Sequence, residues 1–351
     1  SPVVSLSLSS VALVVFTQEP NDTYDPFLSR GLLSRGDPLP WYFIYGNHDG
    51  LAWGNAPITD SPLNFFGRHY PNGTRGILNG ITTGNLSILG FDPSLENMLL
   101  HILNPDNYFV PSDIQREVVD KVDISEILLN SNGLPVGHGV SLIDSWSENR
   151  MRYSFDDSTG KFRVIALDTN VEATALGYIT SSDLSWLNCQ LEDAHNESKQ
   201  VIVATHHRSD SILVRGNAFK SLLKSYPNIV AHLAGHSHKN KVDLQAAEKP
   251  EEYGYWEVAT GAMVNWPQEF RTMEVVLIPN EGYGYLSLKA FTHRQENALS
   301  VGNRGRFIAY MESQLEAGYS NHLPWDHGLV SREGTDLDRN VRLYFKSVNG
   351  N

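Results

Sequence analysis

The amino-acid sequence predicts an α/β fold with a mixed β-sheet. Short apolar runs rich in β-branched residues recur along the chain, and turn residues follow them, as is typical of buried strands. Between several of these runs lie segments with apolar residues at i, i+3 and i+7, the period of an amphipathic helix. Strands that alternate with helices in this way indicate layers of helix packed on sheet.

The first part of the chain offers few regular elements. Val11–Phe16 and Trp41–Tyr45 are apolar runs bounded by polar, proline or glycine residues, so we expect a buried strand at each. Residues from about 50 to 152 are rich in Gly, Asn and Pro. This composition predicts a loop-rich insertion with one helix over Ser112–Leu129.

Regular alternation begins after the insertion. The expected strands are Phe162–Leu167, Val201–Ala204, Ile229–Ala234, Tyr255–Ala259 and Met273–Ile278. The expected helices are Ser182–His195, Asn217–Tyr226 and, further along, Arg306–Ala317. We therefore expect one main domain over residues 1–278, including the insertion, and a C-terminal extension over residues 279–351 packed on it.

Composition narrows the classes of function. The 351-residue chain is 41% hydrophobic, which is enough apolar material for a large core. Its 27 Lys and Arg against 40 Asp and Glu give a net charge of −13, which argues against a nucleic-acid-binding surface. No apolar run reaches the roughly 18 residues of a membrane span. Cys189 is the single cysteine, so an intrachain disulfide and a cysteine-rich zinc module are excluded.

Three clusters rich in His and Asn each follow directly on an apolar run. They are Gly46–Asp49 (GNHD), Thr205–His207 (THH) and Gly235–His238 (GHSH). Ligand sites of open α/β sheets collect where strands end. Imidazole nitrogens and amide oxygens are good ligands for Zn, Mn or Fe, so these clusters together predict a metal site. The glycines let the backbone bend sharply beside a bound ion.

In this order, the three clusters resemble the motifs of the calcineurin-like metallophosphoesterase superfamily, over about residues 11–278. Tyr255–Val258, followed by Asn265–Gln268 and Arg271, is similar to a bacterial branch of that superfamily, and Asp338–Val341 fits the same branch. The resemblance implies a four-layer α/β/β/α sandwich with mixed β-sheets around a two-metal centre. It also implies a small phosphorylated substrate, whose phosphate ester is hydrolysed by a metal-activated hydroxide.

The resemblance also implies roles for single residues. One divalent ion (Mn, Fe or Zn) is bound by Asn47, His206 and His236. The other ion is bound by His238. His48 is the general acid or a phosphate contact, and Asp49 orients its ring. We expect His207 behind the ligands or at the surface. His138, within the insertion, is expected to reach the substrate.

The chain departs from the pattern of that superfamily in its first part. No Asp-x-His occurs before the GNHD cluster, and Gly36-Asp37 reads as a turn rather than as the Gly-Asp that ends a strand. The best positional match for the bridging carboxylate is Glu19, which follows the run Val11–Phe16. Its extra methylene moves the carboxylate by about a bond length relative to Asp. The alternative, that Glu19 is an ordinary loop residue, stays open.

Two explanations fit the missing Asp-x-His. Either the chain begins after a first strand that carried it, or the protein has lost one half of its metal site. The first leaves an enzyme with two ions, and the second leaves a mononuclear or non-catalytic relative that uses the scaffold for binding. A metallo-β-lactamase-like hydrolase is disfavoured, because Lys239-Asn240 stand where that class has Asp-His after its His-x-His.

Overall fold

A computed structural model describes most of the chain from residue 121 on and short pieces before it. The described residues are 6–9, 33–34, 37–38, 41–52, 56–57, 121–143, 150–171, 176–263, 265–278, 281–292, 301–319 and 332–348. The expected strand Val11–Phe16 and the candidate ligand Glu19 lie outside this set. Much of the insertion around residues 50–152 lies outside it as well.

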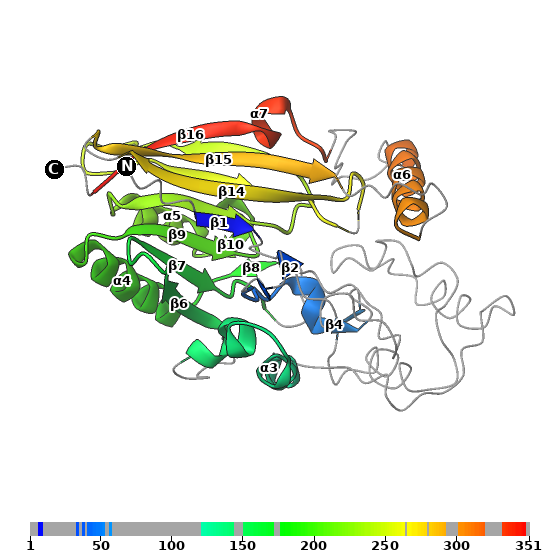
Figure 1. The fold of residues 1–351 in the computed structure, drawn as a ribbon, viewed down its shortest axis with the longest axis horizontal. Coiled ribbons are helices and arrows are strands. Elements are labelled where there is room, and N and C mark those ends of the chain that lie inside the picture. Colours follow the sequence, from blue (N-terminus) through cyan, green and yellow to red (C-terminus); the bar gives the residue numbers. More distant parts are fainter. Residues whose placement is uncertain are drawn as a thin grey trace, which may run out of the picture.

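A six-stranded mixed sheet forms the centre of the described structure (Figure 1). Its order is β12 (Lys241–Gln245), β13 (Tyr255–Ala259), β11 (Ile229–Ala234), β9 (Gln200–Thr205), β7 (Phe162–Leu167) and β6 (Arg152–Asp156). The four inner strands are parallel, and the two outer strands run antiparallel to their neighbours. The expected strands at all four inner positions are confirmed.

Two helices cover one face of this sheet. They are α4 (Ser181–Asn196) and α5 (Gly216–Lys224), and both expected helices are confirmed to within two residues. Leu187 of α4 and Phe219 of α5 pack on Val203 of the sheet, and none of these three side chains is exposed. At its first turn, α4 has a capping box. In it Thr180 Oγ1 accepts from the Asp183 N–H, and Asp183 Oδ2 accepts from the Thr180 N–H, both at 2.9 Å.

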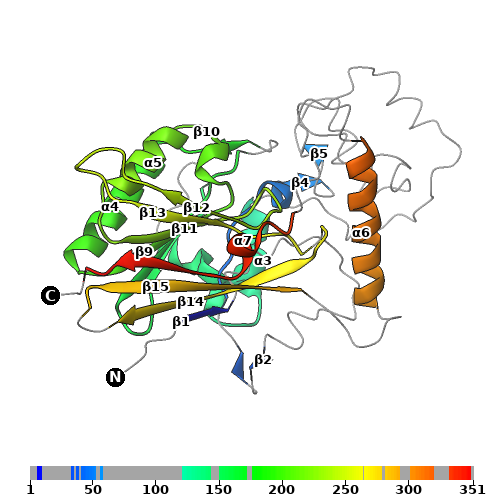
Figure 2. The same ribbon diagram turned by 90° about the horizontal axis from the view of Figure 1, so that it is seen from above.

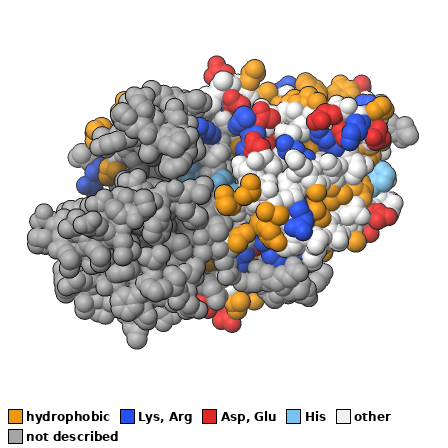
Figure 3. Space-filling view, turned by 180° about the vertical axis from the view of Figure 1, so that it is seen from behind, with side chains coloured by type: hydrophobic (Ala, Val, Ile, Leu, Met, Phe, Trp, Pro, Cys, Tyr) orange, Lys and Arg blue, Asp and Glu red, His pale blue; other side chains and the backbone are white. Residues whose placement is uncertain are grey.

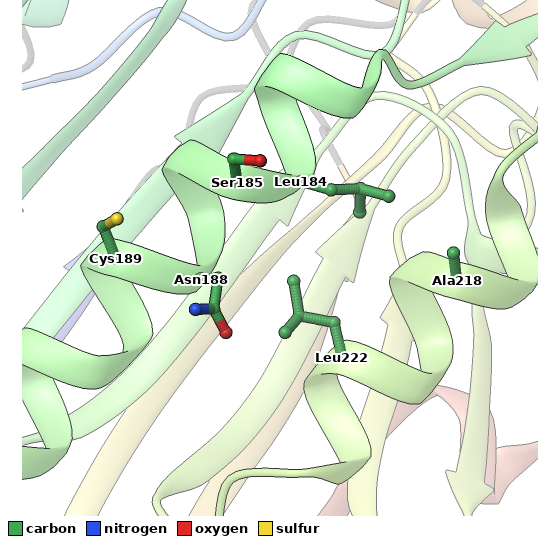
Figure 4. A pocket seen from close by; sticks show the side chains of 6 residues that line it. All are labelled: Leu184, Ser185, Asn188, Cys189, Ala218 and Leu222. Atoms are coloured by element: carbon green, nitrogen blue, oxygen red, sulfur yellow. The ribbon is translucent and has the colours of Figure 1, made fainter.

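The outer side of the helix layer has a hollow between α4 and α5 (Figure 4). Its lining is Leu184, Ser185, Asn188, Cys189, Ala218 and Leu222. None of the candidate site residues lies in it.

A second, antiparallel sheet packs on the other face of the first (Figure 1). Its order is β1 (Leu6–Ser9), β14 (Glu269–Ile278), β15 (Tyr283–Thr292) and β16 (Val341–Lys346). The two sheets bury one continuous core, in which Ile202 and Val258 of the first sheet share a cluster with Val275 and Leu286 of the second. The expected strand Met273–Ile278 is confirmed as part of β14. The predicted domain boundary at residue 278 falls between two paired strands, β14 and β15.

The described residues therefore form three layers, of helix, sheet and sheet, with mixed strand directions. This confirms the α/β class with mixed sheets, and the fourth layer stays a prediction. Helix α6 (Val301–Tyr319) contains the expected helix Arg306–Ala317 and lies beside the ends of the sheets rather than over a face (Figure 2). Among the described helices, none has both the length and the apolar character needed to cross a membrane.

The remaining elements are short. The described part of the expected helix Ser112–Leu129 is α3 (Lys121–Asn130), and α7 (Asp336–Arg339) precedes β16. Three two-stranded ladders pair β2 (Leu33–Ser34) with β3 (Asp37–Pro38), β4 (Leu51–Ala52) with β5 (Ala56–Pro57), and β8 (Gly177–Tyr178) with β10 (Ile212–Val214). The 3-10 helices are η1 (Asn47–Gly50), η2 (Val136–Leu142) and η4 (Ser209–Ser211). Ser34 pairs with Asp37, so Asp37 belongs to a short strand, while Gly36 of the expected turn lies outside the described residues.

The prediction of a strand at Trp41–Tyr45 is wrong, although its prediction of burial is right. Phe43 is only 3% exposed, yet no strand is assigned there. The backbone N–H of Trp41 donates to the carbonyl of Leu134 at 2.9 Å, and that of Phe43 donates to His138 at 2.8 Å. The hydroxyl of Tyr153 donates to the Phe43 carbonyl at 2.6 Å. The backbone of this segment is thus hydrogen-bonded by a loop and by the side chain of Tyr153, where we expected a neighbouring strand.

Leu187→Ala tests the core beneath α4. We expect it to lower the free energy of unfolding by about 3 kcal/mol, because it leaves a cavity against the sheet. Leu213→Ala is the matched control, since Leu213 is 71% exposed and its truncation should change stability by less than about 0.5 kcal/mol. Urea unfolding of both variants measures the difference, and equal values would contradict the packing described.

Candidate metal centre

The parallel strands β9 and β11 deliver histidines to the same edge of the first sheet. His206 and His207 follow β9, and His236 follows β11. The two strand ends are tied together, because the N–H of Gly235 donates to the His206 carbonyl at 2.9 Å. Asn47 approaches from the first residue of η1. Side chains far apart in the sequence therefore meet at one place.

Three donor atoms converge there. Asn47 Oδ1 lies 2.6 Å from His206 Nε2 and 3.2 Å from His236 Nδ1, and the two imidazole nitrogens are 3.2 Å apart. Metal–ligand bonds to such groups are about 2.0–2.2 Å long, so donors of one ion lie about 3 Å from each other. The spacing and the N, N, O donor set fit one Zn, Mn or Fe ion.

His207 adds a third imidazole to the cluster. Among the described residues, ring nitrogens of His206, His207 and His236 lie within 4.8 Å of one another. His207 is buried, and its Nδ1 is 2.9 Å from the hydroxyl of Thr169. His207 is therefore a third candidate imidazole ligand, and its expected place behind the ligands stays a prediction.

Electrostatics keeps His206 in the form that binds metal. Burial lowers the pKa of His206 well below its ordinary value, and the neighbouring His207 and His236 lower it further. Its imidazole is therefore neutral near pH 7, with a lone pair available to an ion. Its Nδ1, on the far side of the ring from Asn47, is buried and has no hydrogen-bond partner among the described residues.

The turn that carries GHSH has an uncommon backbone. His236 and His238 have φ angles of 61° and 54°, in the left-handed region that non-glycine residues rarely adopt. Such residues persist where the surroundings hold them, commonly at functional sites. The turn brings the rings of His238 and His48 to a centroid distance of 6.0 Å. Both are partly exposed, and histidine side chains are visible in the middle of the face drawn in Figure 3.

Asp49 closes the GNHD turn onto its own glycine. Its Oδ2 accepts from the N–H of Gly46 at 2.7 Å. Burial raises the pKa of Asp49 to about 7, with a further rise from Asp168, although the Gly46 N–H opposes it. The Asp49 carboxylate thus binds the backbone of Gly46. Its expected role in orienting the His48 ring stays a proposal.

His138 is held in the protein interior. It is fully buried, stacks on Trp41 at a ring-centroid distance of 3.3 Å, and has φ of 49°. Its Nε2 is 2.9 Å from Ser131 Oγ, and its Nδ1 is 3.3 Å from the Trp41 carbonyl. Burial lowers its pKa. Both ring nitrogens are used in packing the loop against residues 41–45, so the structure gives no support to the expected contact with substrate.

Sequence reasoning missed the residues that follow β7. Asp168 binds the ammonium group of Lys121 at 2.5 Å, and both side chains are buried. Asn170 Nδ2 donates to the Tyr45 carbonyl at 2.5 Å, two residues before Asn47. Together with Thr169, which contacts His207, this segment supports both sides of the centre. The signal was available, because Asp168 directly follows a buried apolar run, as the three clusters do.

Asn240 anchors the GHSH turn to the second sheet and the C-terminal part of the chain. Its amide donates to Glu269 Oε2 at 2.7 Å, and its Oδ1 accepts from Arg271 at 2.9 Å. Its backbone N–H donates to the carbonyl of Arg332 at 2.9 Å. Arg271 also donates to the Asp338 carbonyl at 2.6 Å. Arg271 and Asp338, which the resemblance singled out, thus hold the chain two residues beyond His238.

Comparison with known proteins finds a match in sequence over part of the chain. No family model matches the chain. A segment of 97 residues is 30% identical to the glycerophosphodiester phosphodiesterase GpdQ of Enterobacter lignolyticus strain SCF1. The matched segment covers 25% of this chain and 34% of that protein. The chain thus spans about a third of that relative's length. The similarity supports the resemblance to the metallophosphoesterase superfamily.

Among solved structures, a dimetal phosphatase from Danio rerio matches 43% of this chain and 61% of its own chain. The sequence identity is 15%, and the TM-score is 0.34.

Gly46→Ala tests whether the GNHD turn must lie close to His206. An added Cβ would lie 3.0 Å from Cε1 and Nδ1 of His206, so the ring must shift. We expect the affinity for Mn²⁺ or Zn²⁺, measured by calorimetry, to fall about tenfold, as displaced support of a ligand commonly causes. Gly305→Ala in α6 is the control, because its added Cβ meets nothing within 4 Å. Unchanged affinity in Gly46→Ala would contradict the geometry.

Proposed function

We propose that the protein is a metal-dependent phosphoesterase with its site at the carboxyl ends of β9 and β11. The observation that carries the proposal is the convergence of Asn47, His206 and His236 within 3.2 Å of one another. In this proposal these three residues bind one divalent ion, and His238 binds another. The similarity to GpdQ supports a phosphodiester as the substrate class.

The bound ions would act as Lewis acids on the phosphoryl oxygens and activate water as the nucleophile. The chain's own residues have the remaining tasks. His48, beside His238, contacts the phosphate or donates a proton to the leaving alkoxide. Asp49 binds the backbone N–H of Gly46. This bond fixes the turn and so orients the side chains of Asn47 and His48.

The complete centre also needs a carboxylate between the two ions. We assign this role to Glu19, the residue that follows the first apolar run of the sequence. A carboxylate there would offset part of the repulsion between two cations. The complete fold would be the four-layer sandwich, with residues 279–351 supplying β15 and β16 of its second sheet.

A mononuclear or non-catalytic relative is the second candidate. The specific observation in its favour is that no Asp-x-His precedes the GNHD cluster, since the Asp193-Ala194-His195 of the chain lies within helix α4. Within the described residues, His206, His207 and His236 also make up the one group of three or more candidate His, Cys or carboxylate ligands. Such a protein would bind one ion and a phosphorylated ligand without turnover.

His236→Ala should separate the proposed site from an incidental group of histidines. It removes one of the three converging donors, so we expect at least one bound ion fewer per chain and loss of most hydrolysis. Metal content and hydrolysis of bis(p-nitrophenyl) phosphate and p-nitrophenyl phosphate are the measurements. His195→Ala, on the exposed side of α4, is the matched control. Unchanged metal content in His236→Ala would refute the site. A wild type that binds metal but hydrolyses neither ester would favour the non-catalytic relative.

His48→Ala tests the assignment of proton transfer. General acid catalysis contributes about 10²–10⁴-fold to turnover, so we expect kcat to fall in this range while the metal content stays constant. Loss of metal, with turnover per bound ion unchanged, would show instead that His48 is a ligand.

A further inference from the structure

A row of buried polar side chains lies beneath the candidate metal centre, in the middle of the first sheet. Glu257 of β13, His232 of β11 and Thr205 at the end of β9 are all completely buried. Glu257 and His232 are directly paired across the two strands. The His232 ring packs edge-on against Phe219 of α5 at 5.1 Å, so the row lies on the helix-covered face.

These side chains form a continuous chain of hydrogen bonds. Glu257 Oε2 is 2.9 Å from His232 Nδ1, and His232 Nε2 is 2.8 Å from Thr205 Oγ1. The Thr205 hydroxyl donates to the carbonyl of His207 at 2.6 Å. The chain therefore ends on the backbone of the segment that carries His206.

Counting protons fixes the direction of each bond. Thr205 has one hydroxyl proton, which the His207 carbonyl receives, so Thr205 Oγ1 must accept from His232 Nε2. The pKa of Glu257 is about 2: burial alone would raise it, but His232, the Ser209 N–H and Arg208 outweigh burial. Glu257 is thus an ionised acceptor, and His232 Nδ1 donates to it. Each bond of the row then has one donor, and both ring nitrogens of His232 face acceptors.

Glu257 also holds the other end of the same segment. Its Oε2 accepts from the N–H of Ser209 at 3.1 Å, and its Oε1 lies 2.9 Å from the guanidinium of Arg208. Residues 205–209 are therefore fixed at both ends by one carboxylate. His206 lies in the middle of this short segment.

Burying a row of polar side chains inside a sheet removes them from water, which lowers the stability of the fold. Buried ion pairs contribute little net stability, and apolar side chains of similar volume commonly do as well or better. Fully satisfied polar networks do, however, rigidify the backbone that they contact. Residues that support a metal ligand from behind tune its orientation and affinity in the same way.

We propose that Glu257, His232 and Thr205 act as positioning residues for the metal centre. This relay of hydrogen bonds, from Glu257 through His232 to Thr205, fixes the peptide between His207 and Arg208 and so holds the adjoining His206 imidazole toward Asn47 and His236. The inference rests on the proposed function, because it takes His206 as a metal ligand. It concerns metal affinity rather than turnover, so the positioning role and the phosphoesterase activity can fail separately.

Thr205→Val and Thr205→Ser test the relay. Valine keeps the shape of threonine but removes the hydroxyl that joins His232 to the His207 carbonyl, whereas serine keeps the hydroxyl. We expect calorimetry to show affinity for Mn²⁺ or Zn²⁺ weakened about 10–100-fold in Thr205→Val and restored nearly to the wild-type value in Thr205→Ser. Thr272→Val, in β14 of the second sheet, is the matched control and should bind metal as the wild type does.

Thermal unfolding of the metal-free variants separates positioning from stability. A lower Tm of Thr205→Val with unchanged metal affinity would overturn the relay and leave the phosphoesterase proposal intact. Weakened affinity in Thr205→Val, in a protein whose wild type binds metal but hydrolyses no ester, would support the relay and refute the phosphoesterase. A wild type that binds no metal would overturn both.

Nitrogen NMR of the histidine side chains gives a readout that needs neither metal nor activity. In the metal-free wild type, we expect His232 to show two protonated ring nitrogens. In Glu257→Gln, which removes the charge but keeps the size, we expect loss of this doubly protonated form and a changed signal of His206. A neutral, singly protonated His232 in the wild type would overturn the relay.

Discussion

Parallel pairing of β9 with β11 is the constraint on which the candidate site depends. The register sets Val203 opposite His232 and Ala204 opposite Leu233, so the two strands end at the same level of the sheet. One more bond, from the Gly235 N–H to the His206 carbonyl, extends the contact into the turns. His206 and His236 leave the sheet side by side as a result. A slip of one residue would turn one of the strands over and separate the two rings.

The polar row of Glu257, His232 and Thr205 shares its sheet face with an apolar core. Near the amino ends of the strands, Val201, Ile229 and Tyr255 pack with the helices in a dry cluster. Toward the carboxyl ends, charged and hydroxyl side chains replace them. Along β9, β11 and β13, stability and chemistry are thus separated between the two ends of the strand. This division lets the helices hold one end of the sheet while the other end keeps the groups that a metal centre needs.

Most of the central architecture could be predicted because its signals are local. Apolar runs such as Ile229–Ala234 and the periodicity of Ser182–His195 report burial and helix directly. Trp41–Tyr45 could not be placed in this way, since an apolar run predicts burial but not the partner of its backbone. His138 shows the same limit, because its stacking on Trp41 depends on a loop conformation that spacing does not encode. The convergence of Asn47, His206 and His236 followed from topology, as all three come after buried segments.

The anchor at Asn240 has a consequence for the order in which the molecule assembles. Val242 and Asp338, which share a backbone-to-carboxylate bond beside this anchor, are 96 positions apart. A chain emerging from the ribosome therefore presents every candidate histidine ligand of the centre well before Arg332 and Asp338 are available. Contacts of such separation form late, because closing the long loop costs entropy before the contact stabilises it. The GHSH turn thus gains this support last, and the nascent protein passes through a stage in which His236 and His238 exist but their turn is not yet held by the C-terminal residues.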